Sequence, residues 1–584
     1  MGRLAEATLL FLVACGLTAC DPKPVRTDAD VIVVGAGISG LSAALEASDA
    51  DAGIDVILIE TSSMPGGHAV QAGGFALVGT PLQAKKGHAD SPEIAYRDLM
   101  AWGEDADPAW VRLFADRSRA DIHDWLTAFG VKFNILLDTP EATVPRFHFA
   151  GGRAVNVIVP MLREAYGRRN LRFVMNARVD ELIDTDGAIG VRHRNTRTGA
   201  YDVLLAPSVI LATGGFQSNL EFVRANWPAD LAAPERLLIG AGHNATGDGI
   251  AIGQAYGVAL NRMDDQVTFI NGLPNPRDPT RGLHVENPAA LWVDAGGRRF
   301  VNEAADSKQT GAAGLALAPQ THWLIFDAQG RRKLRLRGAP WLNPKTIADE
   351  ILGDPGTTRS AGTITELASA AGLPADALQA TVDRYNEFVA AGLDEDFQRF
   401  PGNAGMALTT PPYFAMQLFP MTRKSLGGLT IDLQGRVLGD TGQAIDGLFA
   451  AGELTGVAGI NGSHGGSGTF LAPSVLTGRI AGASAAAYAQ TTNTVTRATL
   501  SVDDPVAVTP TDDSTGAATL LTPEQLEALL AADRGGYWHF ERSHSVVLER
   551  KYTCTRCHAH GWPTYPATTT EHRLVQIESC TNCH

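Results

Sequence analysis

Two short motifs near the carboxyl terminus combine cysteine and histidine at a spacing suited to metal chemistry. Both read C-x-x-C-H, and their residues are Cys554, Cys557, His558, Cys580, Cys583 and His584. Two thiols at this spacing can add to the two vinyl groups of one haem, and the adjoining histidine can ligate its iron. A four-cysteine zinc ribbon is the alternative, because paired C-x-x-C also suits zinc. The histidine after each pair and the 22 residues between the pairs favour two c-type haems.

The same tail supplies candidates for the second axial ligand of each iron. No methionine follows Met421, so methionine ligation from this tail is excluded. The remaining histidines of the tail are His539, His544, His560 and His572. Because bis-histidine ligation lacks the upward effect of methionine on the potential, we expect low-potential haems.

A glycine motif close to the amino terminus is suited to binding a dinucleotide. An apolar run at residues 31–34 is followed by Gly35, Gly37 and Gly40 and then by an Ala- and Leu-rich segment. In a strand–turn–helix unit the first glycine allows the tight turn, the second admits a pyrophosphate, and the third lets helix and strand pack closely. The helix N-terminus offers free N–H groups to the phosphates. A second apolar run ends in Glu60, whose carboxylate can accept hydrogen bonds from a ribose.

Composition narrows the class of protein. A chain of 584 residues is long enough for about three domains with a substantial core. The formal charge of −15 and the lack of a basic cluster argue against nucleic acid as a partner. Four of the six cysteines belong to the C-terminal motifs, and Cys15 and Cys20 lie near the amino terminus, so no cysteine is available for a disulfide in the central region.

The first 20 residues have the form of an export signal. A small basic head with Arg3 precedes an apolar segment at residues 9–17, which is too short to span a bilayer. The sequence L-T-A-C that ends at Cys20 resembles a bacterial lipoprotein cleavage site, at which the cysteine is lipidated. An ordinary secretory signal is the alternative. We therefore expect a protein of the periplasm or outer face of a bacterial membrane, lipid-anchored through Cys20.

Several segments between these motifs contain short runs of small and polar residues. After Glu60 come Gly66, Gly67, His68, Gly73 and Gly74, and such runs let backbone lie against a flat ring system. Four later motifs are L-A-T-G-G-F with Thr213, Gly214 and Gly215, N-A-T-G-D-G with Asp248, G-R-R-F-V-N-E at residues 297–303, and L-F-A-A-G-E ending in Glu453.

In this order, over residues 28–489, the motifs resemble those of the FAD-dependent fumarate reductase and succinate dehydrogenase flavoprotein superfamily, which includes 3-ketosteroid dehydrogenases. The resemblance implies an α/β fold with a Rossmann-like FAD-binding domain and an inserted α+β capping domain. The FAD domain is expected at residues 28–260 and 410–489, and the cap at 261–409. A Thr-, Asp- and Pro-rich linker at 490–520 then leads to a small dihaem cytochrome c module at 521–584.

A flavin domain joined to c-type haems is similar to the periplasmic flavocytochrome c fumarate reductases. That family holds a substrate carboxylate with a His and Arg residues and protonates the substrate from an Arg of the cap. The corresponding positions fall here on Arg423, near His464, and on Ser307 beside Lys308, which argues against fumarate itself. Together with Lys424 these residues form a cationic set suited to an anionic or carbonyl-bearing substrate. Either His464 or Lys308 is the expected proton donor.

His68 raises a separate question about how FAD is held. Membrane-bound relatives carry FAD covalently on a histidine of this region, whereas soluble relatives bind it non-covalently. The spacing from His68 to Gly73 and Gly74 is one residue shorter than in the covalent group. Non-covalent FAD is therefore the expectation.

Three functions are compatible with these residues. In the first, electrons relayed by two c-type haems reduce FAD, which reduces the C=C bond of a small unsaturated carboxylate or ketone. In the second, a ketosteroid-like dehydrogenase desaturates its substrate and passes electrons to the haems. The third is an electron relay with a vestigial flavin site. The expected redox partner is quinol-linked or a periplasmic cytochrome.

Overall fold

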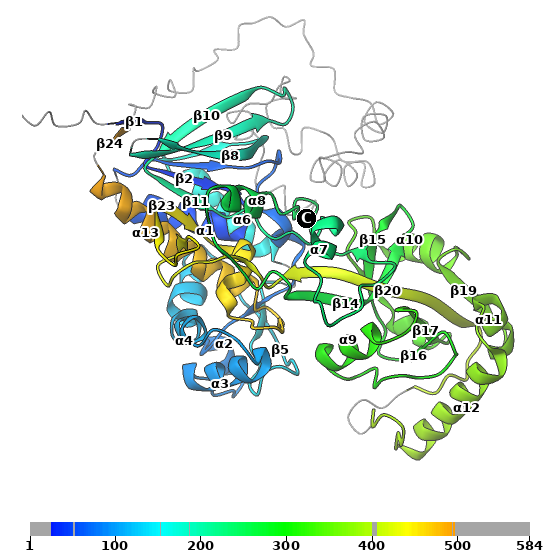
Figure 1. Cartoon of the computed structure of the whole chain (residues 1–584). Helices are drawn as coiled ribbons and strands as arrows, with labels where there is room; N and C mark the ends of the chain where they lie inside the picture. Colours follow the sequence, from blue (N-terminus) through cyan, green and yellow to red (C-terminus); the bar gives the residue numbers. More distant parts are fainter. Residues whose placement is uncertain are drawn as a thin grey trace, which may run out of the picture.

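The computed structural model describes residues 25–50, 53–151, 154–185, 187–399, 406–492 and 494–496. Cys20 with the export signal, and the C-x-x-C-H motifs with all six tail histidines, lie outside these residues. Figure 1 shows two parts, which are joined along the long strand β20 (Tyr413–Ser425). Within the described residues, no helix has the length and apolarity needed to cross a bilayer.

The first part is built on a six-stranded sheet. Its strands, in spatial order, are β22 (Arg436–Leu438), β23 (Ala444–Ala450), β11 (Ser208–Leu211), β2 (Val31–Val34), β3 (Val56–Ile59) and β7 (Leu171–Val174). The central strand β2 pairs in parallel with β11 and β3. All residues of these three strands are buried. Burial on both faces explains why they are continuous apolar runs and do not alternate with polar residues.

Two helices from opposite ends of this part pack tightly on each other. They are α1 (Ile38–Ala50), which follows β2, and α13 (Leu471–Thr491). A Cβ atom at Gly478 or Gly482 of α13 would overlap the carbonyl oxygen of Ser39 or Ala43. The small residues of both helices therefore permit a close backbone approach, and they bring the late segment of the chain onto the first βα unit (Figure 1).

Smaller elements complete the first part. A three-stranded sheet contains β8 (Ala177–Thr185), β9 (Ala188–Asn195) and β10 (Tyr201–Ala206), and a second contains β4 (Phe75–Ala76), β5 (Ile135–Leu137) and β6 (Phe147–Phe149). The helices are α2 (Pro81–Lys85), α3 (Pro92–Gly103), α4 (Pro108–Arg117), α5 (Trp125–Ala128), α6 (Val155–Gly167), α7 (Leu220–Ala225) and α8 (Asp248–Ala255). Beyond α13, β24 (Thr494–Thr496) pairs with β1 (Val25–Thr27), so a short strand forms inside the expected linker.

We call the second part the cap, and it contains an eight-stranded mixed sheet. Its strands are β12 (Leu238–Ile239), β14 (Gln266–Asn275), β15 (Asp278–Glu286), β16 (Leu291–Val293), β17 (His322–Phe326), β18 (Arg335–Arg337), β19 (Thr358–Ala361) and β20. The helices α11 (Ile364–Ala371) and α12 (Ala375–Ala391) pack on it through a core of Leu, Val, Phe and Tyr side chains. The helix α9 (Ser307–Leu315) faces the first part (Figure 1).

The G-R-R-F-V-N-E motif forms a buried ion-pair network inside the cap. Arg299 donates to both oxygens of Glu303, at 2.9 and 2.8 Å, and to both oxygens of Asp394, at 3.1 and 2.8 Å. Arg399 Nη1 lies 3.4 Å from Glu303 Oε2, an oxygen that also accepts a hydrogen bond from Arg299. The side chains of Arg299, Glu303 and Asp394 are at most 4% exposed, so the network ties the loop before α9 to the segment after α12.

Candidate active site

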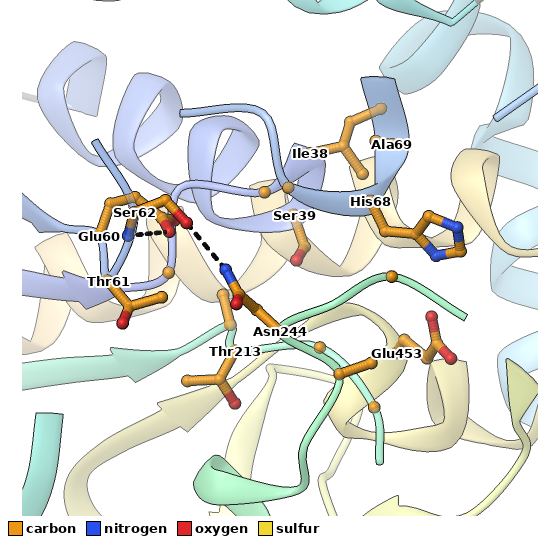
Figure 2. Close-up of a pocket in the computed structure, with 18 of the residues that line it drawn as sticks. Ile38, Ser39, Glu60, Thr61, Ser62, His68, Ala69, Thr213, Asn244 and Glu453 are labelled. Carbon is orange, nitrogen blue, oxygen red and sulfur yellow. Dashed lines mark hydrogen bonds between the residues drawn. The ribbon is translucent and has the colours of Figure 1, made fainter. Parts of the chain in front are cut away.

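A long cleft opens at the carboxyl ends of the central parallel strands. Gly35 follows β2, Glu60 follows β3 and Thr213 comes shortly after β11, and all three line the cleft. In parallel α/β sheets this edge is where ligands bind. Figure 2 shows Glu60, Thr61 and Ser62 at one end and His68 and Glu453 at the other, with Asn244 and Thr213 between them. The cleft is therefore elongated, as a dinucleotide requires.

The three glycines of the motif meet different surroundings. Gly35 has a φ of +101°, and a Cβ there would lie 2.5 Å from the Ala212 carbonyl oxygen. A Cβ at Gly40 would overlap the Gly35 carbonyl oxygen, whereas a Cβ at Gly37 has no atom within 4 Å. Gly67 lies opposite, with its Cβ position 3.1 Å from the Gly37 Cα. Gly35 and Gly40 thus serve local packing, and Gly37 keeps the cleft open at the start of α1.

Glu60 is the acceptor at the first end of the cleft. Its two oxygens accept hydrogen bonds from the backbone N–H groups of Ala36 and Ser62, each at 2.9 Å. Burial raises the pKa of this carboxyl, and the two backbone donors offset part of that effect. Across the cleft, Asn244 donates to the Ser62 hydroxyl at 2.8 Å (Figure 2). Each carboxylate oxygen retains a lone pair that can accept a hydrogen bond from a ribose hydroxyl.

The second end of the cleft carries a lysine held by two neighbours. Lys424 Nζ lies 3.0 Å from Glu453 Oε2 and 3.5 Å from His68 Nδ1. Burial, followed by the charges of Lys424 and Arg423, holds the pKa of His68 well below its usual value. His68 is therefore neutral at physiological pH, and Lys424 supplies the positive charge that faces the cleft. Of these residues, His68, Lys424 and Glu453 line the cleft itself.

The other candidates for catalysis lie in two different places. Arg423 precedes Lys424 on β20 and donates to the Gly240 carbonyl at 2.8 Å. Lys308, from α9 of the cap, pairs with Glu104 at 2.8 Å, and His464 lies 3.4 Å from the same carboxylate. The hydrogen bond from Lys308 lowers the pKa of Glu104. The two candidate proton donors thus share one anion, at the contact between the cap and the first part.

The remaining sequence-predicted cofactor residues divide between the cleft and its supports. The residues that line the cleft are Gly67, Thr213, Gly214, Gly215 and Asp248. The glycines that lie behind its walls are Gly40, Gly66, Gly73 and Gly74. A Cβ at Gly66 would contact Val70 and one at Gly73 would contact Phe149. A Cβ at Gly74 would overlap the His148 carbonyl. Asp248 pairs with Arg178 at 2.9 Å.

Three residues near the site were not singled out by sequence reasoning. Glu104 stands at the end of α3, Arg281 lies on β15, and Ser62 follows Glu60 in the turn after β3. None of them belongs to a motif with a recognised spacing. Only tertiary contacts identify them. Glu104 is paired with Lys308, Arg281 donates to the Ala241 carbonyl, and Ser62 accepts a hydrogen bond from Asn244.

Comparison with known proteins agrees with this geometry. A family model described as an FAD binding domain matches residues 30–471. The chain belongs to this FAD-binding family. It is 34% identical over 472 residues to "Fumarate reductase (cytochrome)" of Shewanella frigidimarina, a match that covers 79% of this chain and 77% of that protein. The family resemblance read from the motifs is confirmed.

Two solved structures are similar across most of the chain. The open conformation of a flavocytochrome c3 fumarate reductase has a TM-score of 0.65 at 30% identity and covers 80% of this chain and 79% of the other. The 3-ketosteroid-Δ4-(5α)-dehydrogenase of Rhodococcus jostii RHA1, in complex with 4-androstene-3,17-dione, has a TM-score of 0.61 at 28% identity, with coverages of 81% and 99%. These comparisons confirm the α/β flavoprotein fold.

The residues present fit FAD. The glycine-lined start of α1 admits a pyrophosphate, Glu60 offers a buried carboxylate to a ribose, and the far end of the cleft offers Lys424 and Glu453 to a flavin ring. The buried hydroxyl of Thr213 has no hydrogen-bond partner among the described residues. The protein is therefore an FAD-dependent oxidoreductase.

In the part of the chain that the structure describes, no cluster of three or more His, Cys, Asp or Glu side chains is placed to hold a metal ion.

Proposed function

We propose that this oxidoreductase acts on a carbon–carbon bond and reduces the C=C bond of a small unsaturated carboxylate or ketone. The observation that carries the proposal is the held cation, Lys424, at the flavin end of the cleft, with Arg423 beside it. Bound FAD supplies hydride at its ring. Negative charge then develops on the carbonyl or carboxylate end of the substrate, where a positioned cation stabilises it. The name of the Shewanella relative, a fumarate reductase, supports this reaction class.

Protonation of the second carbon needs a donor on the opposite side of the substrate. Lys308 and His464 are both within hydrogen-bonding or ion-pairing distance of Glu104, and Lys308 comes from the cap. Glu104 orients both side chains. When the cap rests on the first part, these groups and the cap sheet exclude water from the cleft, which strengthens the electrostatic interactions there.

The reverse reaction is the second candidate function. The similarity to a 3-ketosteroid dehydrogenase structure over 81% of the chain favours it, since the same parts can desaturate a substrate when FAD accepts the hydride. In that case Lys424 polarises the carbonyl and a base near Glu104 takes the proton. The direction of electron flow then depends on the potentials of the cofactors and on the redox partner.

We further propose that two c-type haems carry the electrons. The two C-x-x-C-H motifs support this, and a relative whose name includes "cytochrome" supports it as well. The export signal ending in Cys20 is consistent with the compartment in which c-type haems are attached, with a lipid anchor on the membrane surface, and with a quinol-linked or periplasmic cytochrome as partner.

Two turnover assays separate the candidates. In the first, reduced viologen and a panel of enoates and enones test reduction. In the second, an artificial acceptor with saturated acids and ketones tests desaturation. Turnover in the first assay supports the main proposal, whereas turnover in the second assay alone refutes it and supports the dehydrogenase. No turnover in either assay by protein that holds FAD favours an electron relay.

A further inference from the structure

The small sheet that contains β4, β5 and β6 has one apolar face that is open to solvent. Ile135 and Leu137 of β5 are 38% and 46% exposed. Their cross-strand partners on β6 are Phe149 and Phe147, so all four side chains lie on the same face. The two phenylalanine rings are half-buried, with centroids 4.4 Å apart. The residues that alternate with these four point to the opposite face, which is buried.

This apolar face borders the flavin end of the cleft. A Cβ at Gly73 would lie 3.0 Å from the ring of Phe149 and 3.6 Å from that of Phe147. Gly73 is exposed, and it follows the short helical turn that carries His68 and ends at Gln71. Gln71 lines the cleft and is itself exposed. The apolar face therefore begins where the flavin end of the cleft reaches solvent.

A second strand with exposed apolar side chains is built differently. Tyr201 and Val203 of β10 are 61% and 39% exposed, and their cross-strand partners are Arg194 and Arg192. The Arg192 guanidinium lies 5.7 Å from the centroid of the Tyr201 ring. Charged side chains thus share that face, as is usual where a sheet meets water. The four residues of the β5–β6 face include no charge, and a contiguous exposed apolar surface of this kind marks an interaction site.

The two ends of the described chain lie on the other side of the first part. The strand β1, which begins five residues after Cys20, pairs with β24, where the described residues end. Figure 1 shows this pair at one end of the first part and β5 at the other. An anchor on Cys20 would therefore hold the β1 side near the bilayer and the apolar face away from it.

The carboxyl-terminal segment, residues 521–584, is able to reach the apolar face. The linker from residue 497 to 520 spans about 80 Å when fully extended, whereas a compact unit with the chain length of the first part is about 50 Å across. Tethering gives the segment an effective concentration in about the millimolar range. A contact smaller than the ~800 Å² per partner of a stable complex between separate proteins is then enough, an advantage that a second copy does not have.

We propose that residues 521–584 dock on the face formed by Ile135, Leu137, Phe147 and Phe149, and that this contact brings the two C-x-x-C-H motifs to the flavin end of the cleft. The inference rests on the proposed function, which assigns c-type haems to these motifs, and adds to it the surface at which electrons enter. A domain of about 60 residues buries only about 60% of the surface of its unfolded chain, so it retains apolar side chains for such a contact. In the proposed direction each iron loses one electron, and the two electrons, with a proton from solvent, reduce FAD.

The test detects the docked segment directly, so that it does not depend on turnover. In the full-length, FAD-loaded protein, Leu137 is replaced by the photo-crosslinking residue p-benzoylphenylalanine, and the illuminated protein is digested and analysed by mass spectrometry. Monomeric protein should contain cross-links from position 137 to peptides of residues 521–584. They should be at least tenfold more abundant than those from the same label at Val203, the matched control on β10. Cross-links only to a second copy, seen as a dimer band, only to lipid, or to neither overturn the proposal.

A second measurement tests whether the face serves electron entry. Leu137→Asp places a charge on the face, and Val203→Asp is its control. In protein that holds FAD and haem, electron exchange is followed by the haem absorbance after flash reduction of the flavin. The rate should fall at least tenfold in Leu137→Asp and less than twofold in Val203→Asp, and an unchanged rate in Leu137→Asp overturns the assignment. Protein without haem would refute the haem assignment alone, because the cross-link still decides whether the segment docks.

Discussion

At the scale of single residues, Gly37 and Gly40 show how two positions of one motif meet opposite constraints. A methyl group at Gly37 has free space around it in the protein, yet it would occupy the cleft at the start of α1. A methyl group at Gly40 would overlap the Gly35 carbonyl. The first glycine therefore serves the ligand and the second serves the fold.

This difference gives a first prediction. Gly37→Ala should unfold at the same denaturant concentration as the unsubstituted apoprotein but bind FAD at least about tenfold more weakly, a loss of about 1.4 kcal/mol. Gly40→Ala should lower the unfolding midpoint of the apoprotein itself. Flavin fluorescence titration and urea denaturation of apoprotein measure the two effects. Equal stability of both apoproteins would contradict the assignment of Gly40 to packing.

Lys424 carries the second prediction. Replacement by Met removes the held charge and leaves Glu453 without its ion-pair partner, so kcat should fall by about 10²- to 10³-fold. FAD content should stay near that of the unsubstituted protein, because Lys424 faces the ring end of the cleft and Glu60 holds the other end. Lys424→Arg keeps the charge and should recover part of the rate. A Met variant with an unchanged kcat would remove Lys424 from the mechanism.

At the scale of elements, β20 connects the two parts and carries both Arg423 and Lys424 at its end. This strand belongs to the cap sheet, and the cap also contains the buried network of Arg299, Glu303 and Asp394. This network joins the loop before α9 to the segment after α12 at a place where both are buried. The G-R-R-F-V-N-E motif thus links separate segments within the cap.

The third prediction concerns this network. Glu303→Ala leaves the buried cations Arg299 and Arg399 without their shared acid, and should lower the free energy of unfolding by about 3–5 kcal/mol. The control is Asp396→Ala, which breaks the exposed pair with Arg384 in the same cap and should cost at most about 1 kcal/mol. Chemical denaturation measures both. Similar losses for the two variants would mean that the buried network does not hold the cap.

At the scale of the whole molecule, buried histidines make stability depend on pH. Burial lowers the pKa of His148 to about 4 and that of His322 to about 3. In the unfolded chain each titrates near 6.5. Between pH 6.5 and 4 the unfolded state therefore binds more protons, so stability is full above about pH 6.5 and falls as the pH drops through this window.

His322 gives the fourth prediction. It lies between the rings of Trp292 and Phe300, at centroid distances of 5.1 and 5.6 Å, and its Nε2 has no partner among the described residues. His322→Phe should reduce the slope of unfolding free energy against pH by up to about 1.4 kcal/mol per pH unit between pH 6 and 4.5. Denaturation curves over that range measure it. An unchanged slope would show that His322 does not titrate on unfolding.

Local sequence determined the cofactor and the family. The run from residue 31 to Glu60 contains a complete strand–turn–helix–strand unit, and its geometry follows from neighbouring residues, so a dinucleotide site could be predicted without the rest of the chain. The later motifs added the superfamily and the α/β fold, which the comparisons confirm. The haem motifs and Cys20 remain predictions, because they lie outside the described residues.

Only the tertiary structure decided how the charged side chains are grouped. Lys308 and His464 meet on Glu104 although 204 and 360 positions separate them from it, and Arg281 reaches Ala241 from another strand. Such contacts depend on how β20, α9 and the cap sheet dock, which no local spacing encodes. Charged residues also do not recur in the sequence with a period that would indicate their ion-pair partners. For this reason sequence reasoning placed four basic residues in one set, whereas the folded chain separates them. Lys424 lines the cleft and Arg423 lies behind its wall, while Lys308 and His464 meet at the contact with the cap.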